Sequence, residues 1–288
     1  MTEFLQALGE NAFLRYALAA GVLAGISCGV VGSYVAARRI TYIAGGIAHC
    51  VLAGLGAARY LQVTRGWEWL HPLYGAVVVA LLAATIIGLV SLRFREREDT
   101  VISAVWAIGM AVGVLFIWGT PGYGENLMSY LFGNILMVRR SSLLLMAGLD
   151  IVVVSVGLLC YRQFVAVCFD EEFARLRGIP VSLYYLLLLY LTALTVVLLV
   201  TVVGLVMVIA LLSLPVAIAG LFSKTLRQVM ALSALLSILF TTSGLALSYG
   251  PNLPAGATTV VLAGASYLLC AGGMGIYNRI RRGRSVAA

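Results

Sequence analysis

The sequence predicts an all-α polytopic membrane protein with about nine transmembrane helices. Of its 288 residues, 62% are hydrophobic and 10% are charged, and the mean hydropathy is +1.05. A soluble domain carries about 25% charged residues, so a globular enzyme is excluded. The apolar residues also gather in long runs, close to the roughly 20 residues that a helix needs to cross a bilayer.

Nine apolar runs follow one another along the chain. The sixth and seventh are separated by little more than Gly204, so a tight hairpin or one long span would both fit, and eight spans are the alternative. Pro215 in the seventh run is expected to break or kink its helix. The runs are residues 13–37, 40–62, 73–92, 101–119, 142–161, 181–202, 204–222, 229–248 and 255–277.

Basic residues are concentrated in alternate connections between these runs. The net charge is +8, and charges in these positions set topology rather than bind nucleic acid. With nine spans, five basic groups fall on one side, which predicts a cytoplasmic carboxyl end and an amino end outside. Arg139 and Arg140 are the exception, because the count puts them outside. The five groups are Arg38 and Arg39; Arg93, Arg95 and Arg97; Arg162, Arg175 and Arg177; Lys224 and Arg227; and Arg279, Arg281, Arg282 and Arg284.

Two connections are longer than the others. The outer one, residues 120–140, contains a segment at 125–138 that is too short to cross, and we expect an interfacial or re-entrant helix there. The inner one, residues 162–180, contains a polar stretch that opens at Asp170 and stops at Gly178 and Pro180. Acids at its start and arginines near its end suit the helix dipole, so a short cytoplasmic helix is predicted.

The chain contains no Gly-x-x-x-x-Gly-Lys-Ser/Thr sequence, so any ATP that drives it must be bound by another protein. Its five cysteines have no paired spacing, which argues against a disulfide framework or a zinc knuckle. They are Cys28, Cys50, Cys160, Cys168 and Cys270.

His49 is the most informative residue, because it is ionisable and lies inside an apolar run. It follows Arg39 by ten residues, roughly 15 Å along a helix, which places it near the middle of a bilayer about 30 Å thick. Polar groups at that depth usually contact a transported species or line a pathway. Neutral imidazole binds zinc, iron and similar ions. The alternative is a polar hydrogen bond between helices.

Six segments in order resemble the permease subunit of ABC importers for zinc, manganese and iron. Together they extend over nearly the whole chain, and their order is more specific than any one segment. They are Arg38 and Arg39 with residues 41–50 around His49; Glu98 and Asp99; residues 127–136; residues 170–179; residues 203–217; and residues 247–257.

The resemblance implies the fold of the cobalamin and siderophore importers, with residues 1–288 forming a single transmembrane permease domain in the bacterial cytoplasmic membrane. It implies a homodimer, a cytoplasmic ABC ATPase dimer that binds ATP, and an extracytoplasmic metal-binding protein. The divalent metal is cargo, and no permanently bound cofactor is expected. Residues 163–180 would hold the helix that couples to the ATPase, with Asp170, Glu171, Glu172, Ala174, Arg175 and Gly178 as its matching residues.

The sequence departs from the family pattern at two positions. The family commonly has Asp four residues before the pathway histidine, where this chain has Gly45, and Asn252 stands where Asp is frequent. A carboxylate ligand is therefore missing, which leaves the identity of the metal open. Gly45, Gly46 and Gly56 are expected to let another helix approach and to leave room for an ion.

Three further residues are candidate ligands. Glu125 precedes the short outer segment and would contact metal at the outer mouth, or serve as an acid in the first turn of a helix. Asp150 lies inside the fifth run and is a second intramembrane candidate, or it pairs with a hydroxyl or an arginine on another span. Cys50 would favour zinc as a thiolate, but a small buried apolar role is the stronger interpretation.

The expected function is therefore that of the membrane subunit of an ATP-driven importer of zinc, manganese or iron. A secondary carrier that needs no ATPase is one alternative, although it would require more intramembrane carboxylates than Asp150. A membrane scaffold or sensor with a purely structural His49 is the other. Copurification of a separate ATPase would distinguish the importer from both.

Overall fold

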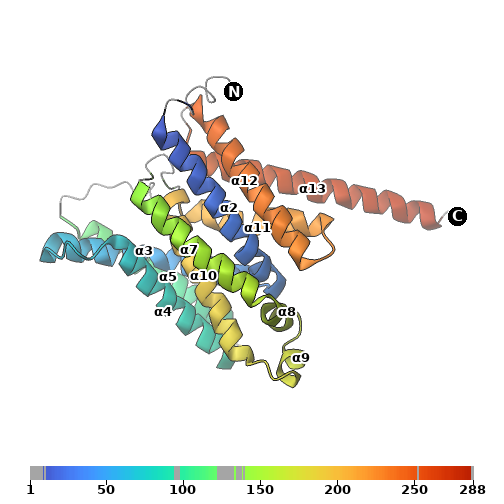
Figure 1. Cartoon of the computed structure of the whole chain (residues 1–288), viewed down its shortest axis with the longest axis horizontal. Helices are drawn as coiled ribbons and strands as arrows, with labels where there is room; N and C mark the ends of the chain where they lie inside the picture. The colour runs from blue at the N-terminus through green and yellow to red at the C-terminus, as the bar shows by residue number, and fades with distance from the viewer. Residues whose placement is uncertain are drawn as a thin grey trace.

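The computed structural model describes residues 9, 11–93, 98–121, 133, 138, 140–251 and 253–286. Within them every regular element is a helix (Figure 1). The helices are α2 (Ala12–Arg38), α3 (Thr41–Arg65), α4 (Pro72–Arg93), α5 (Glu98–Trp118), α7 (Arg140–Leu159), α8 (Tyr161–Phe169), α9 (Glu171–Leu176), α10 (Val181–Val203), α11 (Leu205–Phe222), α12 (Leu226–Tyr249) and α13 (Ala255–Val286).

In the described part of the chain, nine helices are long and apolar enough to cross a membrane. Each corresponds to one predicted run, so the predicted fold class is confirmed. The choice between eight and nine spans is decided at Gly204, whose φ of 83° and ψ of 160° end α10 and begin α11. That backbone region is open essentially to glycine alone, so this residue makes a one-residue link between two spans possible.

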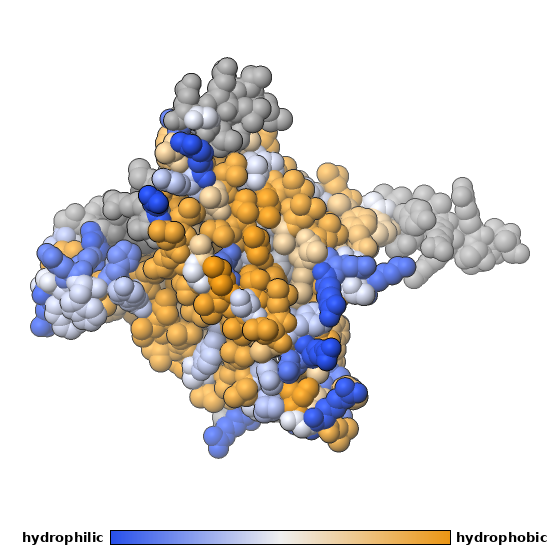
Figure 2. All heavy atoms as spheres, in the orientation of Figure 1, coloured by the Kyte–Doolittle hydropathy of each residue, from blue (hydrophilic) through white to orange (hydrophobic). Residues whose placement is uncertain are grey.

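The outer surface of the bundle is apolar. On α4, Leu82 and Leu89 are more than half exposed, and on α13 Leu269 is 77% exposed. Figure 2 shows hydrophobic residues covering the middle of one face, with hydrophilic residues gathered toward its ends. An apolar surface this extensive would drive aggregation in water, whereas lipid tails cover it without cost.

Close backbone contacts hold α3 between α4 and α5. A Cβ on Gly54 would lie 2.2 Å from the carbonyl oxygen of Gly75 on α4. A Cβ on Gly56 would lie 2.8 Å from the carbonyl oxygen of Gly113 on α5. Without a strong hydrophobic force between helices in lipid, such close packing supplies much of the association. The position of α3 is therefore fixed on two sides.

The inner connection folds as two short helices, α8 and α9. The sequence predicted α9, and its boundaries are confirmed: the Asp170 carboxylate accepts a hydrogen bond from the Phe173 N–H, and Gly178 with φ 75° ends the helix. Helix α8 was not predicted. Residues 161–169 continue the apolar pattern of α7 closely enough to be taken for its end and the start of a loop.

Contacts bring three of the five predicted basic groups to one end of the bundle, those of Arg38, Arg175 and Arg227. Arg38 pairs with Glu171 of α9, and the Arg227 guanidinium lies 4.9 Å from the centroid of the Tyr161 ring on α8. In Figure 1, α2 and α7 run side by side toward α8 and α9. This grouping agrees with the predicted alternation of nine spans.

Two predictions about the helices remain, the effect of Pro215 on α11 and the short outer helix at 125–138. Helix α11 runs without interruption from Leu205 to Phe222 with Pro215 inside it, so the helix is not broken there, and the kink stays a prediction. Packing on neighbouring helices compensates for the missing backbone hydrogen bond at a proline. The predicted short outer helix at 125–138 falls almost entirely outside the described residues, as do Glu125, Arg139 and Asn252.

Replacing Gly113 by Ala should destabilise the folded protein by about 1–3 kcal/mol, because the new Cβ would lie 2.7 Å from the backbone carbonyl carbon of Leu52. The matched control is Gly148→Ala on α7, where a Cβ meets no atom within 4 Å. Thermal unfolding in detergent measures both. Equal midpoints for the two variants would contradict the close packing of α3 against α5.

Candidate functional site

His49 lies half-buried on α3, with its ring stacked on Trp106 of α5. The ring centroids are 4.3 Å apart and the rings are inclined by 30°. The Nδ1 atom lies 2.8 Å from the carbonyl oxygen of Gly45, one turn earlier. A carbonyl can only accept, so Nδ1 carries the hydrogen and Nε2 carries the lone pair. Nε2 is therefore the nitrogen that can bind a metal.

Two more side chains extend this arrangement. The Tyr42 ring lies 5.9 Å from the Trp106 ring, and the Tyr42 hydroxyl is 2.6 Å from Oγ of Ser103. We call Tyr42, His49, Ser103 and Trp106 the His49 cluster. Sequence reasoning missed Trp106, although a tryptophan inside a span, away from the membrane interface where it is usual, was a usable signal.

The three candidate glycines, Gly45, Gly46 and Gly56, have different surroundings. A Cβ on Gly45 would meet only Cδ1 of Ile209 on α11, at 3.9 Å. A Cβ on Gly46 would lie 3.0 Å from Ile102 of α5, and Gly56 lies against Gly113. Gly46 and Gly56 therefore serve close packing, whereas a Cβ at Gly45 would make only an ordinary van der Waals contact. The position of Gly45 therefore accepts a Cβ without a clash.

The other candidate ligands of the described chain are not brought to His49. Cys50 is buried, and its thiol donates to the carbonyl oxygen of Val105 on α5 at 3.1 Å. Asp150 is buried on α7, which packs against α2, and lies near enough to Cys28 to interact with it electrostatically. Among the residues that the structure describes, no three His, Cys, Asp or Glu side chains gather in a metal-binding group.

Helix α9 has an inner and an outer face. On the inner face Ala174 is fully buried, and Glu171 forms ion pairs with Arg38 and, at 3.5 Å, with Arg175. On the outer face Leu176 is 87% exposed and Phe173 is 46% exposed. Glu172, Arg177 and Gly178 are also exposed. The outer face thus combines apolar and charged groups, as a docking surface does.

Residues 10–272 match the ABC 3 transport family. The chain is 40% identical over 244 residues to a probable metal transport system membrane protein of Chlamydia pneumoniae, covering 85% of this chain and 83% of that one. It is 31% identical over 269 residues to the manganese transport system membrane protein MntC of Halalkalibacterium halodurans, covering 93% and 90%.

The fold also resembles a solved structure, PsaBC from Streptococcus pneumoniae in complex with Fab. The TM-score is 0.83 with 30% sequence identity, and the match covers 93% of this chain and 94% of that one. The resemblance that the ordered segments predicted is confirmed by these matches. This chain is a multi-pass membrane protein that belongs to the ABC 3 transport family.

Proposed function

We propose that the chain is the membrane-spanning subunit of an ATP-driven importer and forms the pathway for a divalent transition metal. Manganese is the first candidate because a relative carries that description, and zinc and iron follow. The observation that carries the proposal is the imidazole of His49. Its Nδ1 hydrogen bond to Gly45 leaves the Nε2 lone pair for an ion, about 12 Å along α3 from Thr41.

A site with one imidazole suits transport better than storage. Resident metal sites use three or four protein ligands, and His49 has no carboxylate one turn away because Gly45 occupies that position. An ion must be held weakly enough to leave toward the cytoplasm. His49 therefore acts as a transient ligand, and hydration water completes the coordination of the ion.

Surface chemistry supports a second copy of the chain as a partner. Tyr42 is 44% exposed and Ser103 is also exposed, so polar groups of the His49 cluster reach the surface of a single chain. Hydroxyl and imidazole groups are costly in contact with lipid tails. A second copy that covers this part of α3 and α5 removes them from lipid and lines one central pathway with two His49 residues.

The outer face of α9 supports an ATPase as the second partner. This chain has no nucleotide-binding motif of its own, so the free energy of ATP hydrolysis must reach it through contact with a partner that binds ATP. Phe173 and Leu176 are the apolar groups that such a contact would bury, with Glu172 and Arg177 beside them. Residues 163–180 then form the coupling segment of a single permease domain, and an extracytoplasmic binding protein delivers the metal.

Replacing His49 by Ala should lower manganese uptake more than about tenfold, because the pathway loses its imidazole ligand. Uptake is measured in proteoliposomes that contain this chain, its ATPase and its binding protein. The control is His71→Ala, since His71 is exposed in the connection before α4. Unchanged uptake by the His49 variant would refute the ligand role, and uptake without ATP would favour a secondary carrier.

Replacing Gly45 by Asp should shift preference toward manganese over zinc, because a carboxylate joins the imidazole and a hard ligand favours the harder ion. The Cβ of the new side chain would meet only Cδ1 of Ile209, at 3.9 Å. Gly45→Asn has the same shape without the charge and is the control. Competition between the two metals during uptake gives the ranking, and an identical ranking for both variants would exclude a role for the charge.

The amino end is proposed to lie outside and the carboxyl end inside. In a chain without native cysteines, Glu68→Cys between α3 and α4 should react with an impermeant thiol reagent added outside the cell. Leu176→Cys on α9 should not, although its side chain is 87% exposed. The reverse pattern of labelling would invert the topology.

A further inference from the structure

We propose that Arg38 is the positioning residue that passes movement of α9 to α3 and so to His49. This inference rests on the proposed function, in which α9 contacts the ATPase and His49 contacts the metal. It assigns to the end of α2 a role in coupling.

Arg38 joins three elements. It is the last residue of α2, and its guanidinium forms an ion pair with Glu171 at the start of α9. The same guanidinium lies 5.4 Å from the centroid of the Tyr185 ring on α10. The Tyr185 hydroxyl is in turn 2.9 Å from Oγ of Ser91 on α4. A displacement of α9 therefore acts directly on the end of α2.

The link from Arg38 to α3 is short and fixed. Arg39 adopts a left-handed conformation with φ 62°, and the Ile40 N–H donates to the Val35 carbonyl oxygen at 2.9 Å. A non-glycine residue in this conformation is uncommon and persists where the surroundings hold it. Helix α3 then begins at Thr41. Because Arg39 and Ile40 are held in this way, a rotation of α2 is passed on to α3 and is not taken up by the link.

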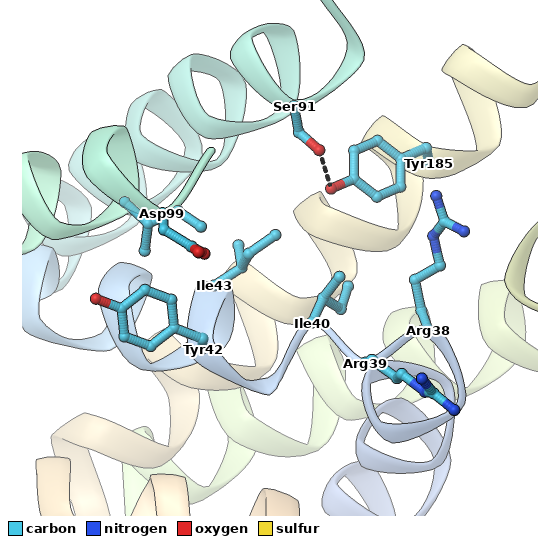
Figure 3. Close-up of a pocket in the computed structure, with 9 residues that line it drawn as sticks. Arg38, Arg39, Ile40, Tyr42, Ile43, Ser91, Asp99 and Tyr185 are labelled. Atoms are coloured by element: carbon cyan, nitrogen blue, oxygen red, sulfur yellow. Dashed lines mark hydrogen bonds between the residues drawn. The ribbon is translucent and has the colours of Figure 1, made fainter. Parts of the chain in front are cut away.

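A pocket of about 210 Å³ lies beside the link between α2 and α3, which Arg39 and Ile40 form. Its lining includes Arg38, Tyr42 and Tyr185, with Asp99 of α5 on the side opposite Arg38 (Figure 3). This pocket is open to the surface, so the side chains that line it are not held by close packing on every side and can shift. Tyr42 lines this pocket and also belongs to the His49 cluster. It therefore connects the link between α2 and α3 to the proposed pathway.

Of the residues that the structure describes, Arg38 and Arg175 pair with Glu171, and they differ in burial. The Arg38 side chain is 25% exposed and that of Glu171 is 15% exposed, whereas the Arg175 side chain is 60% exposed. Solvent-exposed pairs contribute little, so the less exposed Arg38 is expected to dominate the link to Glu171. Arg175 belongs to the proposed coupling helix, so the control is Arg15, an exposed arginine near the start of α2.

The test uses the whole transporter in proteoliposomes and measures metal uptake, basal ATP hydrolysis and copurification of the ATPase. Arg38→Gln and Glu171→Gln should each lower uptake about tenfold while hydrolysis and copurification persist. The charge-exchanged double variant Arg38→Glu with Glu171→Arg should regain part of the uptake. Arg15→Gln, at an exposed position near the start of the same helix α2, should stay within about twofold of the wild type.

Three results would overturn the proposal: coupled uptake by both single variants, loss of the ATPase from them, or an equal effect of Arg15→Gln. A second readout is independent of the cargo. Spin labels at Phe169, which is exposed directly before α9, and at Thr64 should change their separation when the ATPase binds nucleotide, and Arg38→Gln should abolish that change. If wild-type protein shows the change but transports no metal, the proposed cargo fails and this inference stands.

Discussion

In the hydrocarbon of a bilayer, a polar group without a partner is costly, and the structure of this chain depends on that constraint. Helices satisfy the backbone, and side-chain hydroxyls return to the carbonyl four residues earlier, as Thr192 and Thr195 do on α10. His49 satisfies Nδ1 in the same way at Gly45. The bond that lowers the cost of the imidazole also fixes which nitrogen remains for an ion.

Features that depend on one segment alone could be predicted from the sequence. The nine apolar runs, the Asp170 cap and the Gly178 stop all correspond to the structure, because length, capping and left-handed glycine are local properties. The stacking of Trp106 on His49 could not be predicted, since it depends on how α5 packs against α3. The pairing of Arg38 with Glu171 joins residues 133 positions apart, and no local pattern indicates it.

The same distinction applies to the glycines of α3. A single sequence shows Gly45, Gly46 and Gly56 as equivalent small residues, but the structure places Gly46 and Gly56 against α5, whereas a Cβ at Gly45 would make only an ordinary contact with Ile209. Neighbouring positions on one helix thus differ in how closely another helix approaches. Close contacts join α3 to α4 and α5, so the coupling proposed for Arg38 requires these three helices to move together.

The central claim is that Nε2 of His49 binds the transported metal. Pulsed electron paramagnetic resonance of Mn²⁺ held in the assembled transporter tests it most directly, because a coordinated imidazole nitrogen modulates the electron spin echo. The account predicts this nitrogen signal in wild-type protein and its loss in the His49→Gln variant, with His71→Gln unchanged. A nitrogen signal that persists without His49 would contradict the account.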